Sequence, residues 1–224
     1  MIRCVAFDFD GTLVDSNAIK RRTFFELVES IDEGERIVTG ILDELRPGDR
    51  YAITRELARL LVAQGKGPAG VAAEEWGGCL AEDYTRRCEL AVSSCREIPG
   101  ASAALAWLAA EGIHCYVNSA TPEGPLRSIV KRRSLERRFR QVLGGPASKS
   151  ENLNRIGADA GVDAGEILMV GDGEDDRSAA ASFGCRFAAI ARPGPSRFAV
   201  EPTVRMQDLT ALPRVVTRMR EQAA

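Results

Sequence analysis

The sequence predicts an α/β protein with a Rossmann-like parallel sheet covered by helices on both faces, and a block of helices inserted after the first strand. Short apolar runs of strand length alternate with helical segments from about residue 96 onward. This alternation is typical of a parallel sheet with crossover helices. Residues 16–95 have no such alternation and are predicted to be helical. We therefore expect a sheet domain of residues 1–15 and 96–224 and a helical domain of residues 16–95.

The individual elements follow from apolar periodicity and from Gly and Pro punctuation. The expected strands are 4–7, 113–117, 141–143, 167–170 and 187–190, with a last short strand near Val204. The expected helices are 16–33, 51–62, 72–90, 101–110, 124–135, 153–160, 176–183 and one after Asp208. A turn at Pro47-Gly48-Asp49 leads into the second of these helices.

Composition and charge narrow the class of protein. The 224 residues are 45% hydrophobic and 28% charged, with a formal net charge of -2, which is ordinary for a globular protein. We expect neither a nucleic-acid nor a membrane partner. We interpret the basic cluster within 127–140 as a solvated helix face, with an anionic partner or a lipid headgroup as the alternative. None of the six cysteines forms a C-x-x-C pair. We expect reduced thiols in a cytoplasmic monomer or homodimer without a leader or a membrane span.

Polar side chains follow four of the predicted strands. Asp8 and Asp10 follow the first strand, Ser119 the second, Lys149 the third and Asp172 the fourth. Because ligands bind at the carboxyl ends of strands in such sheets, we expect these groups to converge. Three carboxyl groups in one small volume are unfavourable without a cation, and hard oxygen ligands suit Mg²⁺. Each residue alone could instead be a turn, a helix cap or a solvated side chain.

The pattern resembles the haloacid dehalogenase superfamily. The first signature of that family is similar to DFDGTLVDS at residues 8–16, and the second to VNSATP at 117–122. The third is similar to GGPASK at 144–149 and the fourth to VGDGEDD at 170–176. The resemblance extends from Val5 to about Ile190 and implies the family's sheet core.

The resemblance implies a role for each carboxylate. Asp8 would attack phosphorus and form an aspartyl-phosphate, and Asp10 would act as general acid and base. Mg²⁺ would be held by the Asp8 and Asp172 carboxylates and the backbone carbonyl of Asp10. Asp176 would lie beside the metal or bind it through water, since its spacing from Asp172 fits the family better than that of Asp175.

The remaining candidates concern phosphate and substrate. Ser119, the neighbouring backbone at Ala120, and Lys149 would bind the phosphate. The helical domain resembles the family's C1-type cap. Arg50, in a turn loosely similar to a G-x-S-R-Y element of phosphoglycolate-phosphatase-like proteins, would bind a carboxylate or second anionic group of the substrate. The alternative for Arg50 is an exposed arginine at a helix start.

The predicted function is a Mg²⁺-dependent phosphatase acting on a small phosphorylated metabolite, either a sugar phosphate or a phosphoglycolate-like compound. The acid at Asp10 argues against the dehalogenases, which resemble this sequence but lack that group. A phosphomutase of the β-phosphoglucomutase type and a catalytically silent phospho-ligand binder remain open alternatives. A receiver domain is disfavoured, because its nucleophile follows a central strand well inside the chain.

Overall fold

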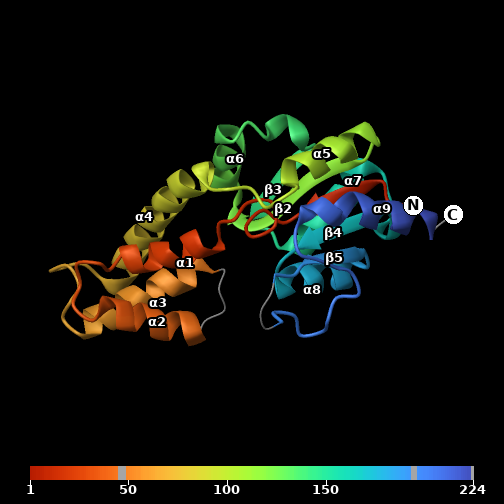
Figure 1. Cartoon of the computed structure of the whole chain (residues 1–224). Helices are drawn as coiled ribbons and strands as arrows, with labels where there is room; N and C mark the ends of the chain where they lie inside the picture. Colours follow the sequence, from red (N-terminus) through yellow and green to blue (C-terminus); the bar gives the residue numbers. More distant parts are fainter. Residues whose placement is uncertain (45–48, 193–195, 223–224) are drawn as a thin grey trace. The chain divides into compact units, whose positions relative to one another are not determined.

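The computed structural model describes residues 1–44, 49–192 and 196–222 and divides into two compact units. Residues Met1–Ser16 and Ser93–Ala224 form one, here called the sheet unit, and Asn17–Val92 form the other, the helical unit. Figure 1 shows the strands of the first and the helix bundle of the second. Within the described residues, no helix is both long enough and apolar enough to cross a membrane.

The described residues of the sheet unit form a sheet of six parallel strands, which confirms the predicted fold class. They are β1 (Cys4–Phe7), β2 (His114–Pro122), β3 (Gln141–Gly145), β4 (Ile167–Gly171), β5 (Arg186–Ile190) and β6 (Arg205–Met206). Their order is β3-β2-β1-β4-β5-β6, and every neighbouring pair is parallel. Phe7, the last residue of β1, pairs with Val117 on one side and Val170 on the other. The chain therefore leaves β1, β2 and β4 at the same level.

Helices cover both faces of this sheet. They are α5 (Ala101–Ala110), α6 (Glu123–Arg132), α7 (Lys149–Ala160), α8 (Glu174–Phe183) and α9 (Leu212–Glu221), with short 3₁₀ turns at Glu136–Arg138, Ala164–Glu166 and Leu209–Ala211. On one face, α7 and α8 bury Leu153, Ile156 and Ala180 against strand residues such as Ala6 and Tyr116. The right-handed crossover rule places α5 and α6 on the opposite face, where α5 contacts β2 and α9.

The helical unit has its own apolar core. Its helices are α1 (Asn17–Glu26), α2 (Gly34–Glu44), α3 (Arg50–Ala63) and α4 (Ala73–Ser94). The Phe24 ring stacks on Tyr84 with a centroid separation of 4.2 Å, and Leu57 and Leu61 are fully buried beside them. A core of this kind lets the unit pack independently of the sheet.

Several predicted boundaries were wrong. Helix α4 ends at Ser94 instead of about 90, and α6 ends at Arg132 instead of 135. The helix expected at 16–33 ends at Glu26, and a separate helix, α2, begins at Gly34 after Glu33 adopts a positive φ of 57°. Strand β2 continues to Pro122, beyond the predicted end at Val117. Helix α7 begins at Lys149 instead of 153. Of the predicted turn before α3, Pro47 and Gly48 lie outside the described residues, whereas Asp49 accepts hydrogen bonds from the first amides of that helix.

Candidate active site

The predicted functional side chains of the sheet unit lie at the carboxyl ends of its strands. Asp8 directly follows β1, and its amide donates to the Val170 carbonyl at 2.8 Å. The register of β1 with its two neighbours places Asn118 and Gly171 at the level of Asp8. β1 is the point at which the strand order reverses, which is where open α/β sheets bind ligands.

A buried ion cluster joins three of the predicted residues. Lys149 Nζ lies 3.0 Å from Asp8 Oδ1 and 2.5 Å from Asp176 Oδ1. All three side chains are nearly inaccessible to solvent, with exposed fractions of 11% for Lys149, 6% for Asp8 and 2% for Asp176. One ammonium group therefore links the end of β1 to the first turn of α8 through two carboxylates.

The backbone of Lys149 is fixed from both sides. Ser148 caps α7 in a reciprocal arrangement with Glu151: the serine oxygen accepts from the Glu151 amide, and the glutamate accepts from the Ser148 amide at 2.7 Å. The buried amide of Asn118 donates to the Lys149 carbonyl at 2.9 Å. As the first residue of the helix, Lys149 is held where its side chain reaches the carboxylates.

The charges in this cluster do not balance. Burial raises the pKa of Asp8. The ammonium group of Lys149 lowers this pKa, and the carboxylates of Asp176 and Asp10 raise it further. Burial likewise raises the pKa of Asp176, with Asp172 contributing. Burial alone would lower the pKa of the Lys149 ammonium, but the two carboxylates outweigh it and raise that pKa. Lys149 stays protonated, and the surplus of carboxylates favours a further cation.

The carboxylates have the spacing of a metal site. One oxygen from each of Asp8, Asp172 and Asp176 lies within 4.8 Å of the others. Close carboxylate oxygens are the ligands that Mg²⁺ takes in proteins, so the donor set fits this ion. Asp175, the rival considered for the fourth signature, is exposed. A Cβ at Gly171 would lie 2.2 Å from Asp176 Cγ, so glycine at this position makes room for the carboxylate.

Asp10 has different surroundings. Ser16 Oγ donates to its Oδ1 at 2.6 Å, and Thr121 Oγ1 donates to its Oδ2 at 2.8 Å. Both donors are buried, whereas Asp10 is partly exposed. Hydrogen bonds to both oxygens fix the plane of the carboxylate. The orientation of Asp10 therefore depends on neutral hydroxyl groups.

The second signature lies on an irregularity of the sheet. Asn118 pairs with Leu143 and Pro122 with Gly145, so the register shifts between them. Bulges of this kind re-aim side chains next to functional sites. The buried Ser119 oxygen accepts from the Thr121 amide at 3.1 Å, which leaves its hydroxyl proton for another acceptor. Ala120, between them, is exposed.

Sequence reasoning gave no role to three residues that hold the site together. Asn118, Thr121 and Ser16 orient Lys149 or Asp10 through the bonds above. Thr121 carried a usable signal, since in an extended strand it shares a side with Ser119. Ser16 stands at the end of the first signature, but its contact with Asp10 depends on how the chain turns after β1.

Arg50 lies in the helical unit as the first residue of α3. It is only 6% exposed, so the alternative of an exposed helix-start arginine was wrong. Its guanidinium donates to Thr85 Oγ1 at 3.2 Å and lies 5.3 Å from the centre of the Tyr84 ring. In the described ranges no carboxylate pairs with it.

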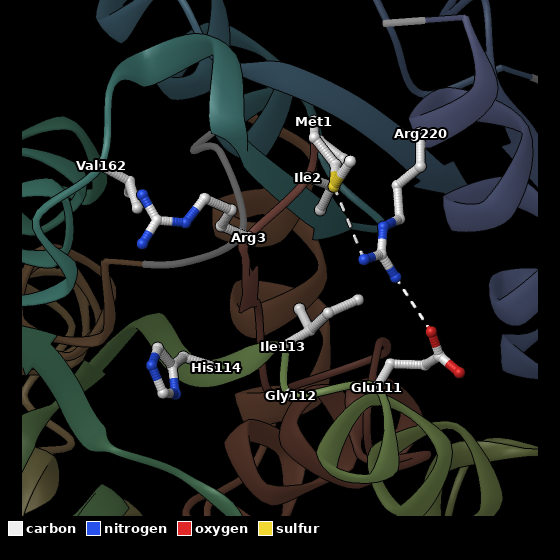
Figure 2. A pocket seen from close by; sticks show the side chains of 9 residues that line it. All are labelled: Met1, Ile2, Arg3, Glu111, Gly112, Ile113, His114, Val162 and Arg220. Atoms are coloured by element: carbon white, nitrogen blue, oxygen red, sulfur yellow. Dashed lines mark hydrogen bonds and ion pairs between the residues drawn. The ribbon is translucent and has the colours of Figure 1, made fainter. Parts of the chain in front are cut away.

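A hollow lies at the opposite ends of the strands from the carboxylate cluster (Figure 2). It measures about 100 Å³ and is lined by Arg3, His114, Glu111 and Arg220, among others. Arg220 already donates to Glu111 at 3.0 Å and to the Met1 sulfur at 3.6 Å. Its place at the amino ends of β1 and β2 separates it from the carboxylate cluster, and we do not regard it as the active site.

Comparison with known proteins agrees with this geometry. A family model described as haloacid dehalogenase-like hydrolase matches residues 2–184. A phosphoglycolate phosphatase of Rhodospirillum rubrum is 30% identical over 202 residues, which is 82% of this chain and 77% of that protein.

Solved structures match over nearly the whole chain. A predicted phosphoglycolate phosphatase from Haemophilus somnus 129PT has a TM-score of 0.73 at 17% identity, covering 96% of this chain and 98% of the other. A putative hydrolase of the same family from Bacillus subtilis, bound to magnesium, has a TM-score of 0.72 at 16% identity, covering 96% and 99%. At these identities the structural matches establish the fold.

Proposed function

The chain belongs to the haloacid dehalogenase-like hydrolase family, and we propose that it is a Mg²⁺-dependent phosphatase that uses Asp8 as its nucleophile. The single observation that carries this proposal is the buried cluster in which Lys149 contacts both Asp8 and Asp176 beside Asp172. It provides a nucleophilic carboxylate, a fixed positive charge and oxygen ligands at one point.

Asp8 would attack the phosphorus of the substrate with one carboxylate oxygen, and the ester oxygen would leave. The phosphoryl group would then be carried as an aspartyl-phosphate until water displaces it, so one difficult step becomes two easier ones. Lys149 would neutralise the negative charge that accumulates when an anionic phosphate approaches a carboxylate. The Ser119 hydroxyl and the backbone at Ala120 would donate hydrogen bonds to phosphate oxygens.

Asp10 would transfer the protons. In its protonated form it would donate to the leaving oxygen, and as a carboxylate it would then accept a proton from the attacking water. The hydroxyls of Ser16 and Thr121 support this assignment, because they hold the carboxylate in one orientation in the structure.

Mg²⁺ would be held by Asp8, Asp172 and the backbone carbonyl of Asp10, with Asp176 beside it or bound through water. Bound there, the ion would supply positive charge that offsets the charge of the phosphate and the surplus of carboxylates. The spacing of the carboxylates supports this, since one oxygen from each of Asp8, Asp172 and Asp176 lies within 4.8 Å of the others.

For the substrate we propose a small phosphorylated metabolite with a second anionic group, of the phosphoglycolate type. The relatives named phosphoglycolate phosphatase support this class, and so does Arg50, a buried guanidinium without a carboxylate partner among the described residues. We propose that the helical unit serves as the cap and that Arg50 contributes to substrate choice.

A phosphate-release assay tests the proposal. Purified protein is given phosphoglycolate, sugar phosphates and an ester without a second charge, each with Mg²⁺ and with chelator. We expect release that requires the metal and favours phosphoglycolate. Arg50→Lys should raise KM for phosphoglycolate without raising it for the uncharged ester, whereas Arg55→Lys, at an exposed position of the same helix, should change neither. Turnover that persists in chelator would contradict the metal proposal.

A further inference from the structure

The chain after β5 returns to the carboxylate cluster and places an arginine on one of the acids proposed to hold the metal. Arg197 lies 3.5 Å from Asp172, measured from its terminal nitrogen to Oδ2. The arginine side chain is 69% exposed and the aspartate 16% exposed. A residue outside all four signatures, Arg197, therefore also contributes charge at the site.

Contacts on the next two residues hold Arg197 in place. The Ala199 amide donates to Glu174 Oε2 at 3.0 Å, and the Phe198 ring meets Phe187 of β5 edge to face at 6.0 Å. Glu174 is the first residue of α8 and is itself held by Arg177 through bonds of 2.6 to 3.2 Å. The segment that carries Arg197 is thus anchored to the element that carries Asp176.

We propose that Arg197 is a positioning residue that competes with the divalent cation for Asp172 and so sets the affinity for the metal. The proposal rests on the proposed function insofar as Asp172 is taken to be a metal ligand. While the guanidinium neutralises Asp172, an incoming cation meets a like charge and a carboxylate that is already paired. Metal binding must weaken that pair or displace it.

The exposure of Arg197 limits the strength of this competition. Exposed ion pairs are weak and are screened by salt. Arg197 is therefore suited to tune the affinity for the metal without blocking the site. Released from Asp172, the guanidinium stays at the edge of the site on its anchored segment.

The same stretch of chain offers a matched control. Arg192 lies two residues after the end of β5 and pairs with Asp15 at 2.9 Å, with side-chain exposures of 46% and 47%. Asp15 is not one of the grouped carboxylates. Arg192→Gln removes the same charge from the same stretch of chain but leaves the partner of Asp172 intact.

Titration calorimetry of Mg²⁺ into the full-length, metal-free protein tests the proposal. We expect Arg197→Gln to bind Mg²⁺ about 2- to 5-fold more tightly than the wild type, the size that an exposed pair allows. Arg197→Lys should stay close to the wild type, and Arg192→Gln should differ from it by less than about 1.5-fold. The advantage of Arg197→Gln should shrink when the salt is raised from 0.05 M to about 0.5 M, because screening removes the repulsion.

Each other outcome counts against the proposal. Equal or weaker binding by Arg197→Gln would overturn it, and so would a gain that is independent of salt or is matched by Arg192→Gln. Asp172→Asn separates this failure from a failure of the proposed function. If the wild type binds Mg²⁺ and Asp172→Asn does not, the metal site stands whatever Arg197 does. If the wild type binds no Mg²⁺, both the metal site and the role of Arg197 are wrong.

Discussion

Asp8 and Asp10 are two residues apart, yet their surroundings differ in kind. Asp8 is buried and contacts an ammonium group, with two further carboxylates close by. Asp10 is partly exposed and accepts from two hydroxyl groups. A nucleophile must be held near positive charge to meet an anionic phosphate, whereas a proton carrier must exchange protons with its surroundings. The difference in environment thus gives a physical basis for two roles on one loop.

Replacing Asp8 should have the largest effect, since the substitution removes the proposed nucleophile itself. Asp8→Asn should lower kcat by more than about 10⁴-fold, the size expected when a nucleophile is removed. The measurement is phosphate release in single-turnover mixtures. A cooperative thermal unfolding transition is the control for folding, because the amide keeps the shape of the side chain. Activity within 10-fold of the wild type would remove Asp8 from the mechanism.

Lys149→Met tests whether the ammonium group of Lys149 stabilises the buried carboxylates of Asp8 and Asp176. The change leaves Asp8 and Asp176 buried without their cation, so metal-free protein should lose about 3–5 kcal/mol of unfolding free energy, unless the acids take up protons. Chemical denaturation measures this loss. Mg²⁺ should restore part of it, because the ion supplies the missing charge. A variant as stable as the wild type at pH 8 would show that the cluster does not depend on Lys149.

Thr121→Val tests the hydrogen bond that the Thr121 hydroxyl donates to Asp10. Losing a hydrogen bond to a charged group costs about 1.5–3 kcal/mol, so kcat should fall roughly 10- to 100-fold. The reason is that Asp10 loses one of the two hydroxyl donors that fix the orientation of its carboxylate. Thr121→Ser keeps the hydroxyl and should retain most of the activity. Equal losses in both variants would point to packing instead of the hydrogen bond.

Glu174 extends the comparison of Asp8 with Asp10, because it accepts hydrogen bonds both from a charged group, the Arg177 guanidinium, and from a hydroxyl group, that of Ser178. Bonds from Arg177, the Ala199 amide and Ser178 lower its pKa to about 2, whereas burial raises that of Asp8. A lowered pKa stabilises the folded state above the unfolded pKa of about 4.3, and this stability is lost as the pH falls toward 2.

The melting temperature tests this effect, which is the smallest of the four. The wild type should melt above Glu174→Gln at pH 6, and the gap should close between pH 4.5 and 2. A gap that stays constant over this range would show that the charge of Glu174 contributes nothing.

Much of the fold could be predicted because the strands are short apolar runs with clear punctuation. The boundaries that were wrong have local causes. Helix α2 was missed because its start depends on Glu33 taking a left-handed conformation, which the residue type does not favour. The end of β2 was placed too early because the polar stretch from Asn118 to Thr121 looks like a loop, although it is a distorted strand.

The candidate site was predictable as far as its motifs extend. Asp8, Lys149 and Asp176 were expected on one edge of the sheet, and the structure brings them into contact. Contacts that depend on how the chain folds back cannot be read from a sequence motif. Ser16 reaches Asp10 only because the chain turns back after β1, and Arg197 reaches Asp172 through a segment anchored on Glu174.

The most direct test of the central claim is to trap the covalent intermediate. Protein turning over phosphoglycolate with Mg²⁺ is quenched in acid, and the phosphorylated peptide is mapped by mass spectrometry. The account predicts a labile phosphoryl group on Asp8, formed at a rate at least equal to turnover and absent from Asp8→Asn. Turnover accompanied by a phosphoryl group on any other residue would contradict the assignment of Asp8 as the nucleophile.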